Sequence, residues 1–363
     1  MKVNYILFVI LTFMLSCNDS DKPERTDVKI SCNPTELTFA HAGETKTVSV
    51  SSTREWLMYS EDKWIQFTPS SSLESEATVT VTAEPNKDIT ERTGTLVVKS
   101  GTERISISLK QGGVPMADLK PNTELAENYK LVWHDEFDDA SAKMLNEKAW
   151  WYENWESGRV NNELQRYVQS EKTAAIENGI LKIRAIKEGD EVQSARVNTS
   201  ESWKYGYFEA KLKLPKGKGT WPAFWMMPKE EGPWPDCGEI DIMEEIGGKP
   251  NYVSSSIHCK SYNHVQNTQK TRETLIDGAE DEFHIYALEW TPDYIRTYVD
   301  GKELFYYPND GKNNADTWPF NKPFYLKLNL AWGGTWGGSH GVDETALPAT
   351  YEIDYVRVFQ IKQ

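Results

Sequence analysis

Apolar and polar residues alternate with a period of two over much of the chain after the first 30 residues. In residues 31–111 the alternating runs are short, and turn residues such as Ala42-Gly43 separate them. Alternation puts apolar side chains on one face of a strand, and short strands at this spacing are typical of a β-sandwich. The pattern therefore predicts a small Ig-like β-sandwich over residues 31–113.

Longer alternating runs follow a polar segment at 114–128, which we expect to be a linker. They include residues 205–214, 324–329 and 351–359, and helical periodicity is scarce between them. Long antiparallel strands in two layers are the pattern of a jelly roll, whose curved inner sheet supplies a long cleft. We therefore predict an all-β chain in which residues 129–363 form one large concanavalin-like β-sandwich jelly roll.

The start of the chain has the pattern of an export signal. Its apolar run is short for a membrane-spanning helix and ends in a small residue followed by a cysteine. The four residues from Met14 to Cys17 resemble a bacterial lipobox, which implies cleavage before Cys17 and a lipid on its thiol. We therefore expect a signal peptide at 1–16, a tether at 17–30, and anchoring to one face of the bacterial outer membrane. An ordinary secretory signal with an incidental cysteine is the alternative.

Composition favours a neutral polymer over a nucleic acid as the partner. The formal net charge is −15, whereas phosphate binding needs clustered Lys and Arg. The chain also has 14 Trp and 17 Tyr, and aromatic rings are platforms for the apolar faces of sugars. Beyond Cys17 there are Cys32, Cys237 and Cys259, an odd number without metal-ligand spacing, so we expect neither a disulfide nor a cysteine metal site. We expect a monomer.

The segment GEIDIMEE carries the strongest candidate chemistry. On a regular strand Glu239 and Asp241 share one face, and Glu244 lies on the other. A one-residue bulge around Ile242 and Met243 would return Glu244 to the face of Glu239. The two glutamates would then suit the carboxyl separation of about 5.5 Å that retaining glycosidases use. The alternative is an acidic run on a solvated strand, which the interleaved apolar residues weaken.

This segment resembles the Glu-x-Asp-x-x-Glu signature of glycoside hydrolase family 16 in its bulged, laminarinase-like form. Similar blocks occur in the family's order over nearly all of the second domain, at 161–165, 219–228, 283–292, 329–334 and 353–358. The resemblance implies a retaining endo-β-glycosidase in which Glu239 is the nucleophile, Asp241 orients it and Glu244 is the acid/base.

The resemblance also implies a set of ligand-binding residues. The residues that are similar to those lining the sugar subsites are Asn162, Arg196, Trp221, Trp225 and His258. At Trp332 the chain has a large ring where many laminarinases have a small aliphatic residue, and we expect this ring to reshape a subsite and contact substrate. The family often binds a structural calcium, and Glu136 and Asp354 stand where its ligands would be; we expect no cofactor for catalysis. From pattern alone, His258 is also explained as a satisfied structural histidine.

The first domain resembles the BACON domains of exported carbohydrate-processing proteins. The likeness is carried by Trp56, Trp64, Asn86, Arg92, Gly94 and the closing Gln111-Gly112-Gly113. A buried tryptophan is usual in such sandwiches, so we expect the two tryptophans to fill the core and the domain to be a spacer. Glycan binding through the same rings is the alternative.

Fold and catalytic residues do not determine the substrate. We rank a β-1,3-glucan or mixed-linkage β-glucan first. An endo-β-galactosidase acting on keratan, mucin-type O-glycans or other galactans is the second hypothesis, and Trp332 favours it. A non-catalytic, glycan-binding surface lipoprotein is the hypothesis from another class, and the presence of both glutamates argues against it.

Overall fold

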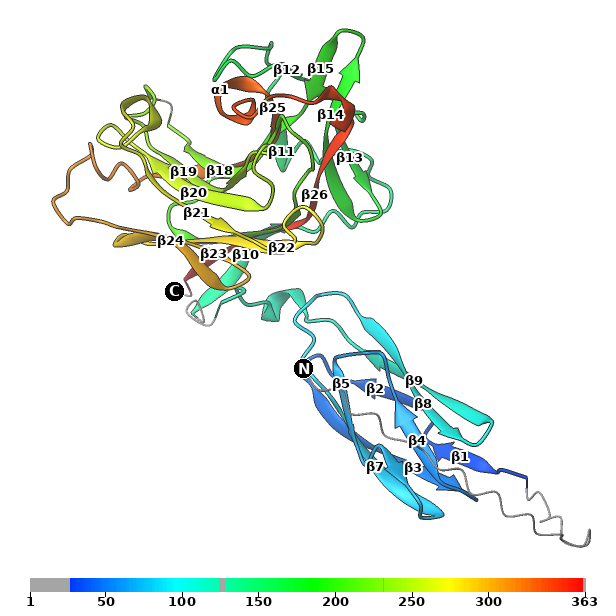
Figure 1. The fold of residues 1–363 in the computed structure, drawn as a ribbon. Coiled ribbons are helices and arrows are strands. Elements are labelled where there is room, and N and C mark those ends of the chain that lie inside the picture. Colours follow the sequence, from blue (N-terminus) through cyan, green and yellow to red (C-terminus); the bar gives the residue numbers. More distant parts are fainter. Residues whose placement is uncertain (1–26, 124–127, 231, 362–363) are drawn as a thin grey trace, which may run out of the picture. The chain divides into compact units, whose positions relative to one another are not determined.

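The computed structural model describes residues 27–123, 128–230 and 232–361 (Figure 1). The predicted signal peptide and Cys17 lie outside these residues, so lipid anchoring stays a prediction. Within the described part of the chain, no helix has the length and apolarity needed to cross a membrane. Contacts divide the chain into two units, and the boundary along the sequence falls between Val114 and Pro115.

The first unit is a β-sandwich of two sheets, with strand orders β1-β3-β7-β5 and β2-β9-β8-β4-β6 (Figure 1). Alternate residues of its strands form the core, among them Val48 and Val50 of β3. Trp56 is buried in this core and Trp64 packs against it, as predicted. The strands are β1 Ile30–Asn33, β2 Glu36–Phe39, β3 Glu44–Ser52, β4 Trp56–Tyr59, β5 Ile65–Thr68, β6 Ser71–Ser72, β7 Glu76–Ala83, β8 Arg92–Ser100 and β9 Glu103–Gln111.

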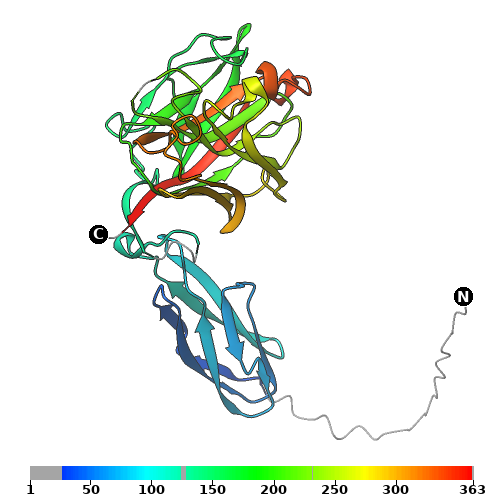
Figure 2. The same cartoon turned by 90° about the vertical axis from the view of Figure 1, so that its left-hand side faces the viewer.

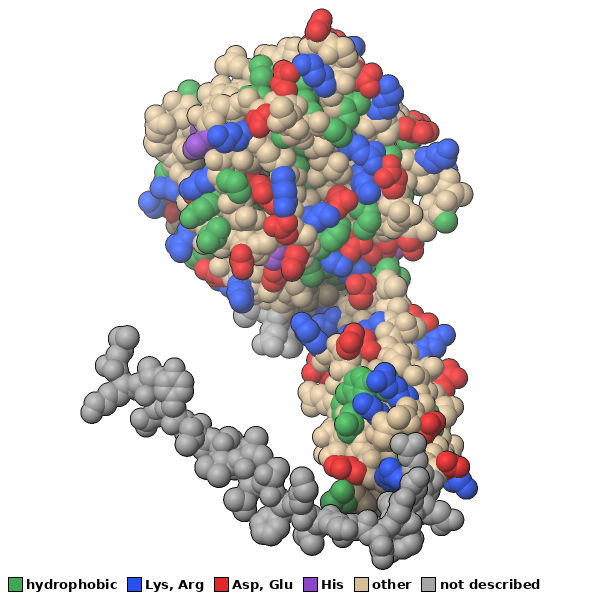
Figure 3. Space-filling model, turned by 45° about the vertical axis from the view of Figure 1, so that its right-hand side comes forward, with side chains coloured by type: hydrophobic (Ala, Val, Ile, Leu, Met, Phe, Trp, Pro, Cys, Tyr) green, Lys and Arg blue, Asp and Glu red, His purple; other side chains and the backbone are tan. Residues whose placement is uncertain are grey.

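The second unit consists of two large sheets that curve in the same sense (Figures 1 and 2). Ten strands form one sheet, whose main path is β12-β15-β14-β26-β17-β22-β23-β24, with β10 on β26 and β13 on β14. Seven strands form the other sheet, in the order β11-β16-β25-β18-β19-β20-β21. This is the two-layer β-sandwich that the alternation predicts. On the face shown in Figure 3, its acidic and basic side chains are interspersed.

The ten-stranded sheet contains β10 Tyr129–Asp135, β12 Gln165–Tyr167, β13 Ala174–Glu177, β14 Ile180–Glu188, β15 Glu191–Ser194, β17 Gly206–Lys213, β22 His284–Trp290, β23 Tyr294–Val299, β24 Lys302–Pro308 and β26 Ala349–Ile361. The seven-stranded sheet contains β11 Trp150–Tyr152, β16 Arg196–Thr199, β18 Thr220–Pro228, β19 Glu239–Glu245, β20 Tyr252–His258, β21 Lys270–Leu275 and β25 Phe324–Trp332. The helices are short: η1 Met116–Asp118, η3 His264–Gln266, α1 Gly334–Gly337 and η4 Glu344–Ala346.

Strand β25 shows how alternation sorts side chains between the two faces of the seven-stranded sheet. Leu328 and Leu330 point into the core between the sheets, whereas Lys327 and Asn329 point to the opposite face. Trp332 continues the core series and is only 1% exposed. The prediction that Trp332 contacts substrate is therefore wrong, because the period of two turns its ring away from the open face.

The segment predicted as a linker belongs in part to the second unit. Leu119 is buried, and the backbone N–H of Asn122 donates to Oε2 of Glu209 at 3.0 Å. Burial raises the pKa of Glu209 to about 7, and the nearby guanidinium of Arg357, 3.8 Å away, opposes that shift. Residues 115–123 therefore form a strap. The strap buries its own Leu119 and donates a hydrogen bond to the buried carboxyl group of Glu209.

We expect the strap to set the stable boundary of the second unit. A fragment of residues 115–363 keeps the strap, whereas residues 129–363 lose the burial of Leu119 and the hydrogen bond to Glu209. The shorter fragment should be less stable by about 3 kcal/mol. Urea unfolding of the two fragments, beside the full chain, measures this difference. Equal unfolding free energies would show that the strap does not stabilise the unit.

Candidate active site

The predicted bulge is present in β19. Asp241 pairs with Ser256 of β20 and Glu244 with Ser254, so three steps along β19 match two along its partner. Pairing with β18 shows the same irregularity, which leaves Ile242 as the extra residue between Asp241 and Met243. Glu244 is thereby returned to the face of Glu239.

A tight turn leads into the bulged strand. Gly238 has φ of +88°, and a Cβ at this position would lie 2.9 Å from a side-chain carbon of Pro319. Glycine adopts this conformation at little cost, and a larger residue would meet the proline ring. The turn therefore holds Glu239 at a fixed place at the start of β19.

Three of the four acids of β19 line a cleft on the open face of the seven-stranded sheet. A cavity of about 360 Å³ is lined by Glu239, Asp241 and Glu244 together with Trp225. A second cavity of about 610 Å³ adjoins it and continues toward β21. The residues that line both cavities are Asn161, Trp221, Glu239, Glu244 and His264. The cleft therefore extends to both sides of the two glutamates.

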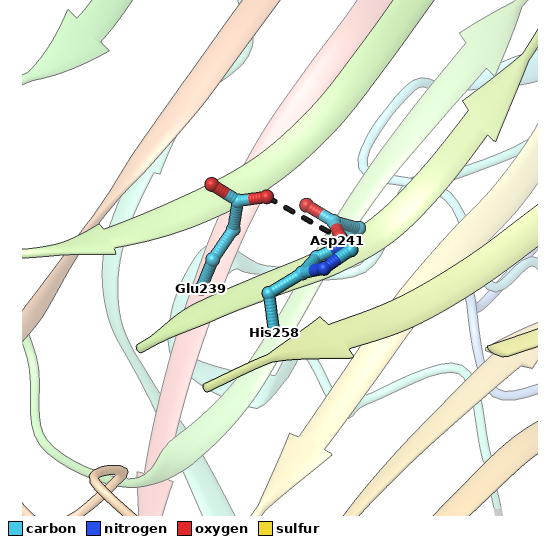
Figure 4. A group of neighbouring side chains, drawn as sticks. All are labelled: Glu239, Asp241 and His258. Carbon is cyan, nitrogen blue, oxygen red and sulfur yellow. Dashed lines mark ion pairs between the residues drawn. The ribbon is translucent and has the colours of Figure 1, made fainter. Parts of the chain in front are cut away.

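Each carboxylate has its own partner. The indole Nε1 of Trp234 donates to Glu239 at 3.1 Å, and Nε1 of Trp221 donates to Glu244 at 3.0 Å. The third acid, Asp241, lies beside His258 of the adjacent strand, whose Nε2 is 3.3 Å from Asp241 Oδ2 and 3.9 Å from Glu239 Oε1 (Figure 4). Glu239, Asp241 and His258 each offer one possible metal-ligand atom, and these atoms lie within 4.8 Å of one another. A divalent metal bound there would occupy the carboxylate of Glu239.

Burial raises the pKa of all three carboxyl groups, and the neighbouring charges separate the two glutamates. Burial and the charge of Asp241 raise the pKa of Glu239 to about 7, while His258, Trp234 and Arg196 oppose the shift. The pKa of Glu244 is raised well above its usual value, by burial first and then by the charges of both other acids. Arg196 favours the ionised form of Glu239, and an ionised Glu239 favours the protonated form of Glu244. These directions suit a nucleophile at Glu239 and a proton donor at Glu244.

Arg196 is held by a buried aromatic and acidic cage. Its guanidinium carbon lies 4.8 Å from the Trp155 ring centre and 4.6 Å from that of Tyr167. It forms ion pairs with Glu153 at 3.4 Å and Glu163 at 3.7 Å. The cage keeps a charged group at the cleft floor, where its field reaches Glu239.

The structure places most of the predicted substrate residues on the cleft. Arg196, Trp221 and Trp225 line the first cavity, and His258 lines the second. Asn162 is exposed, donates to Thr335 Oγ1 at 3.1 Å and lines neither cavity; its neighbour Asn161 lines both. Consecutive left-handed residues at 161 and 162, with φ of 50° and 53°, turn the chain sharply and separate the two side chains.

Several further cleft residues were not predicted as site residues. Among them are Trp155, Trp234, His264, Asn329 and Trp336. Asn329 could have been found, since its even spacing from Lys327 puts it on the open face of β25. Trp234 lies in a turn before β19 and His264 begins the three-residue helix η3, and their rings lie 4.8 Å apart. Neither a turn nor so short a helix has a periodic pattern that would indicate where its side chains point.

The two residues predicted as calcium ligands are engaged by protein cations. Glu136 accepts two hydrogen bonds from Arg357, at 2.9 and 2.8 Å. Asp354 forms an ion pair with Lys211 at 2.6 Å. A calcium ion would have to displace both cations, so this arrangement does not fit the expected ligand set. Cys32, Cys237 and Cys259 are free thiols, in agreement with the expectation of no disulfide.

Two glutamates on one face of a bulged strand in a jelly-roll cleft are the pair of carboxyl groups that a retaining glycosidase needs. Comparison with known families identifies the chain further. The model of glycosyl hydrolases family 16 matches residues 159–357, and that of the viral BACON domain matches residues 29–114. The chain belongs to glycosyl hydrolase family 16 and is a glycoside hydrolase preceded by a BACON-type domain.

Three relatives illustrate the similarity of the second unit. The chain is 41% identical to a beta-glucanase of Rhodothermus marinus over 252 residues, which cover 66% of this chain and 87% of the relative. The X-ray structure of the laminarinase from Rhodothermus marinus aligns with a TM-score of 0.62 at 42% identity, covering 65% of this chain and 98% of that one. A keratan-sulfate endo-1,4-beta-galactosidase of Sphingobacterium multivorum is 30% identical over 254 residues, covering 67% of this chain and 58% of the relative.

The raised pKa of Glu244 predicts a pH-dependent stability. A carboxyl group whose pKa is higher in the folded than in the unfolded chain stabilises the fold at low pH. That stabilisation is lost as the pH rises through the folded-state pKa. Glu244→Gln should therefore raise the free energy of unfolding at pH 8.5 more than at pH 5, by about 1.4 kcal/mol for each unit of pKa shift.

Denaturant titration of wild type and Glu244→Gln at the two pH values measures this effect. The matched control is Glu230→Gln, because Glu230 is exposed and should give no pH-dependent gain. A gain for Glu244→Gln that is equal at both pH values would contradict the raised pKa.

Proposed function

We propose that the chain is an endo-acting β-glucanase that cuts β-1,3-linked or mixed-linkage glucan with retention of the anomeric configuration. One observation carries the mechanism: the bulge at Ile242 puts Glu244 on the face of Glu239 inside the cleft. The names and identities of the Rhodothermus marinus relatives support the substrate class.

Each carboxyl group has a defined part in the proposed double displacement. The Glu239 carboxylate attacks the anomeric carbon as the bond to the leaving sugar breaks, and Glu244 gives its proton to the leaving oxygen. Water then gives a proton to Glu244 and attacks the glycosyl-enzyme, which releases Glu239. Asp241 and His258 hold the nucleophile in place, and the Trp234 N–H directs one carboxylate oxygen.

The form of the cleft supports cleavage within a chain. The two adjoining cavities let sugar units lie on both sides of Glu239 and Glu244. Trp225 lies on one side and Trp336 on the other, so aromatic rings are available along both arms. An internal bond of a polysaccharide can therefore reach the catalytic residues without a free chain end.

The rival hypotheses have less support. The cleft position next to Trp332 is held by Ala331, a small residue, so the argument that a large ring there favours galactans no longer applies. The keratan-sulfate relative keeps an endo-β-galactosidase as the second candidate. A binding-only role would require a misplaced acid/base, and the bulge places Glu244 in the cleft.

Variants of the two glutamates should differ in whether a substrate with a good leaving group restores their activity. Glu239→Gln should abolish hydrolysis of every substrate, because an amide cannot attack the anomeric carbon. Glu244→Gln should slow polysaccharide hydrolysis by about 10²- to 10⁴-fold, yet cleave an aryl β-glycoside with a good leaving group much better, because that bond needs no proton. Initial rates of both variants on both substrates measure this. Equal losses on both substrates for Glu244→Gln would contradict its role as the acid.

Substrate choice is tested with one panel of polymers: laminarin, mixed-linkage glucan, agarose, keratan sulfate and mucin. We expect laminarin and mixed-linkage glucan to give a ladder of oligosaccharides early in the reaction, which is the product pattern of internal cleavage. Sizing the products by chromatography measures it, and Glu239→Gln is the blank. If keratan sulfate or mucin is cleaved and both glucans stay intact, the glucanase proposal is contradicted and the endo-β-galactosidase takes its place.

A further inference from the structure

One row of side chains crosses the seven-stranded sheet from its edge to the catalytic strand. Strand pairing puts Trp151 of β11 opposite Asn198, Asn198 opposite Lys327, Lys327 opposite Trp225, and Trp225 opposite Asp241. Neighbouring strands lie about 4.8 Å apart, so four steps separate the backbones of Trp151 and Asp241 by about 19 Å. The row therefore extends well beyond the place that a sugar unit next to the catalytic acids would occupy.

Trp151 ends this row with its ring toward the open face of the sheet. Trp150, the preceding residue, is buried in the core, so alternation turns Trp151 to the face that carries the cleft. Of the tryptophans in the described residues, Trp151 is the most exposed, at 41%. An exposed indole on the edge strand of the sheet offers apolar area that no further strand covers.

Tyr325 lies beside the exposed indole, and the two rings together form one aromatic surface. The rings of Trp151 and Tyr325 lie 5.8 Å apart at an angle of 53°. Tyr325 pairs across the strands with Met227, and Met227 lines the first cavity. The pair, which we call the edge shelf, is thus continuous with the cleft through β18 and β25.

A buried cation fixes the edge shelf. Lys327 Nζ lies 5.9 Å from the Trp151 ring centre and 5.2 Å from that of Tyr325. The same ammonium group is 4.9 Å from the Trp225 ring, pairs with Glu153 and donates to Asn198 Oδ1 at 2.6 Å. Lys327 is 2% exposed, and burial lowers the pKa of its ammonium group to about 8, while the charge of Glu153 opposes that shift. The group is buried within 6 Å of three ring centres, which is the range of cation–π attraction. The rings are therefore held in place before any ligand arrives.

We propose that the edge shelf is a distal sugar-binding subsite for the same glucan chain. It rests on the proposed function, since it needs a polymer that crosses the cleft from the catalytic acids to β11. Aromatic faces stack on the apolar faces of sugar rings, and the distance along the row means that several sugar units separate this contact from the bond that is cut. The edge shelf makes the enzyme favour long chains over short oligosaccharides.

A series of β-1,3-glucan oligosaccharides of increasing length tests the subsite. For wild type, kcat/KM should keep rising until the chain is long enough to reach Trp151. For Trp151→Ala it should level off earlier and be about three- to tenfold lower on long chains, with short chains unaffected. Trp151→Phe should keep most of the wild-type kcat/KM on long chains. The control is Tyr306→Ala, which removes a 45% exposed ring from the other sheet.

Tyr325→Ala provides a second variant if Trp151→Ala does not fold. Binding of the same oligosaccharides to Glu239→Gln, with and without Trp151→Ala, gives a readout that is independent of turnover. If wild type and Trp151→Ala cleave glucan with the same dependence on chain length, the subsite proposal is overturned and the proposed function stands. Wild type that cleaves no β-1,3-glucan would overturn the proposed function.

Discussion

The chemistry of this enzyme depends on one extra residue in one strand. Without Ile242 the period of two would send Glu244 into the core between the sheets, where an unpaired carboxylate costs several kcal/mol. With it, Glu244 joins Glu239 in the cleft, while Ile242 and Met243 are both buried in the core. The bulge thus serves packing and catalysis together, because the same irregularity buries the apolar residues and aligns the acids.

Around that strand the protein keeps several charges out of water. All four carboxyl groups on β19 have raised pKa values, and the buried cations Arg196 and Lys327 lie on the strands beyond β18. Aromatic rings surround both cations, and Glu153 pairs with each. The charge of Arg196 lowers the pKa of Glu239, and the charge of Glu239 raises the pKa of Glu244, so the two pKa values are pushed apart. The same cations position rings that a sugar chain can use.

Much of the fold and the catalytic strand could be predicted from the sequence, because both follow from periodicity. Acids interleaved with core residues in GEIDIMEE conflict with a regular strand, and a bulge resolves the conflict. Periodicity does not give a side chain's partner when that partner lies far away along the chain. The partner of Glu136, for example, is Arg357, 221 residues away. Trp332 was assigned by resemblance, whereas counting along β25 would have placed it in the core and Ala331 in the cleft.

The stereochemistry of the first products tests the central claim most directly. If the bulge sets Glu239 and Glu244 about 5–5.5 Å apart, no water fits between nucleophile and sugar, and Glu239 must attack the anomeric carbon itself. Two inversions then return the β configuration. Proton NMR of the reducing ends, recorded within the first minutes of hydrolysis and before mutarotation, should show the β-anomer first. The α-anomer appearing first would contradict the double displacement and the role of the bulge.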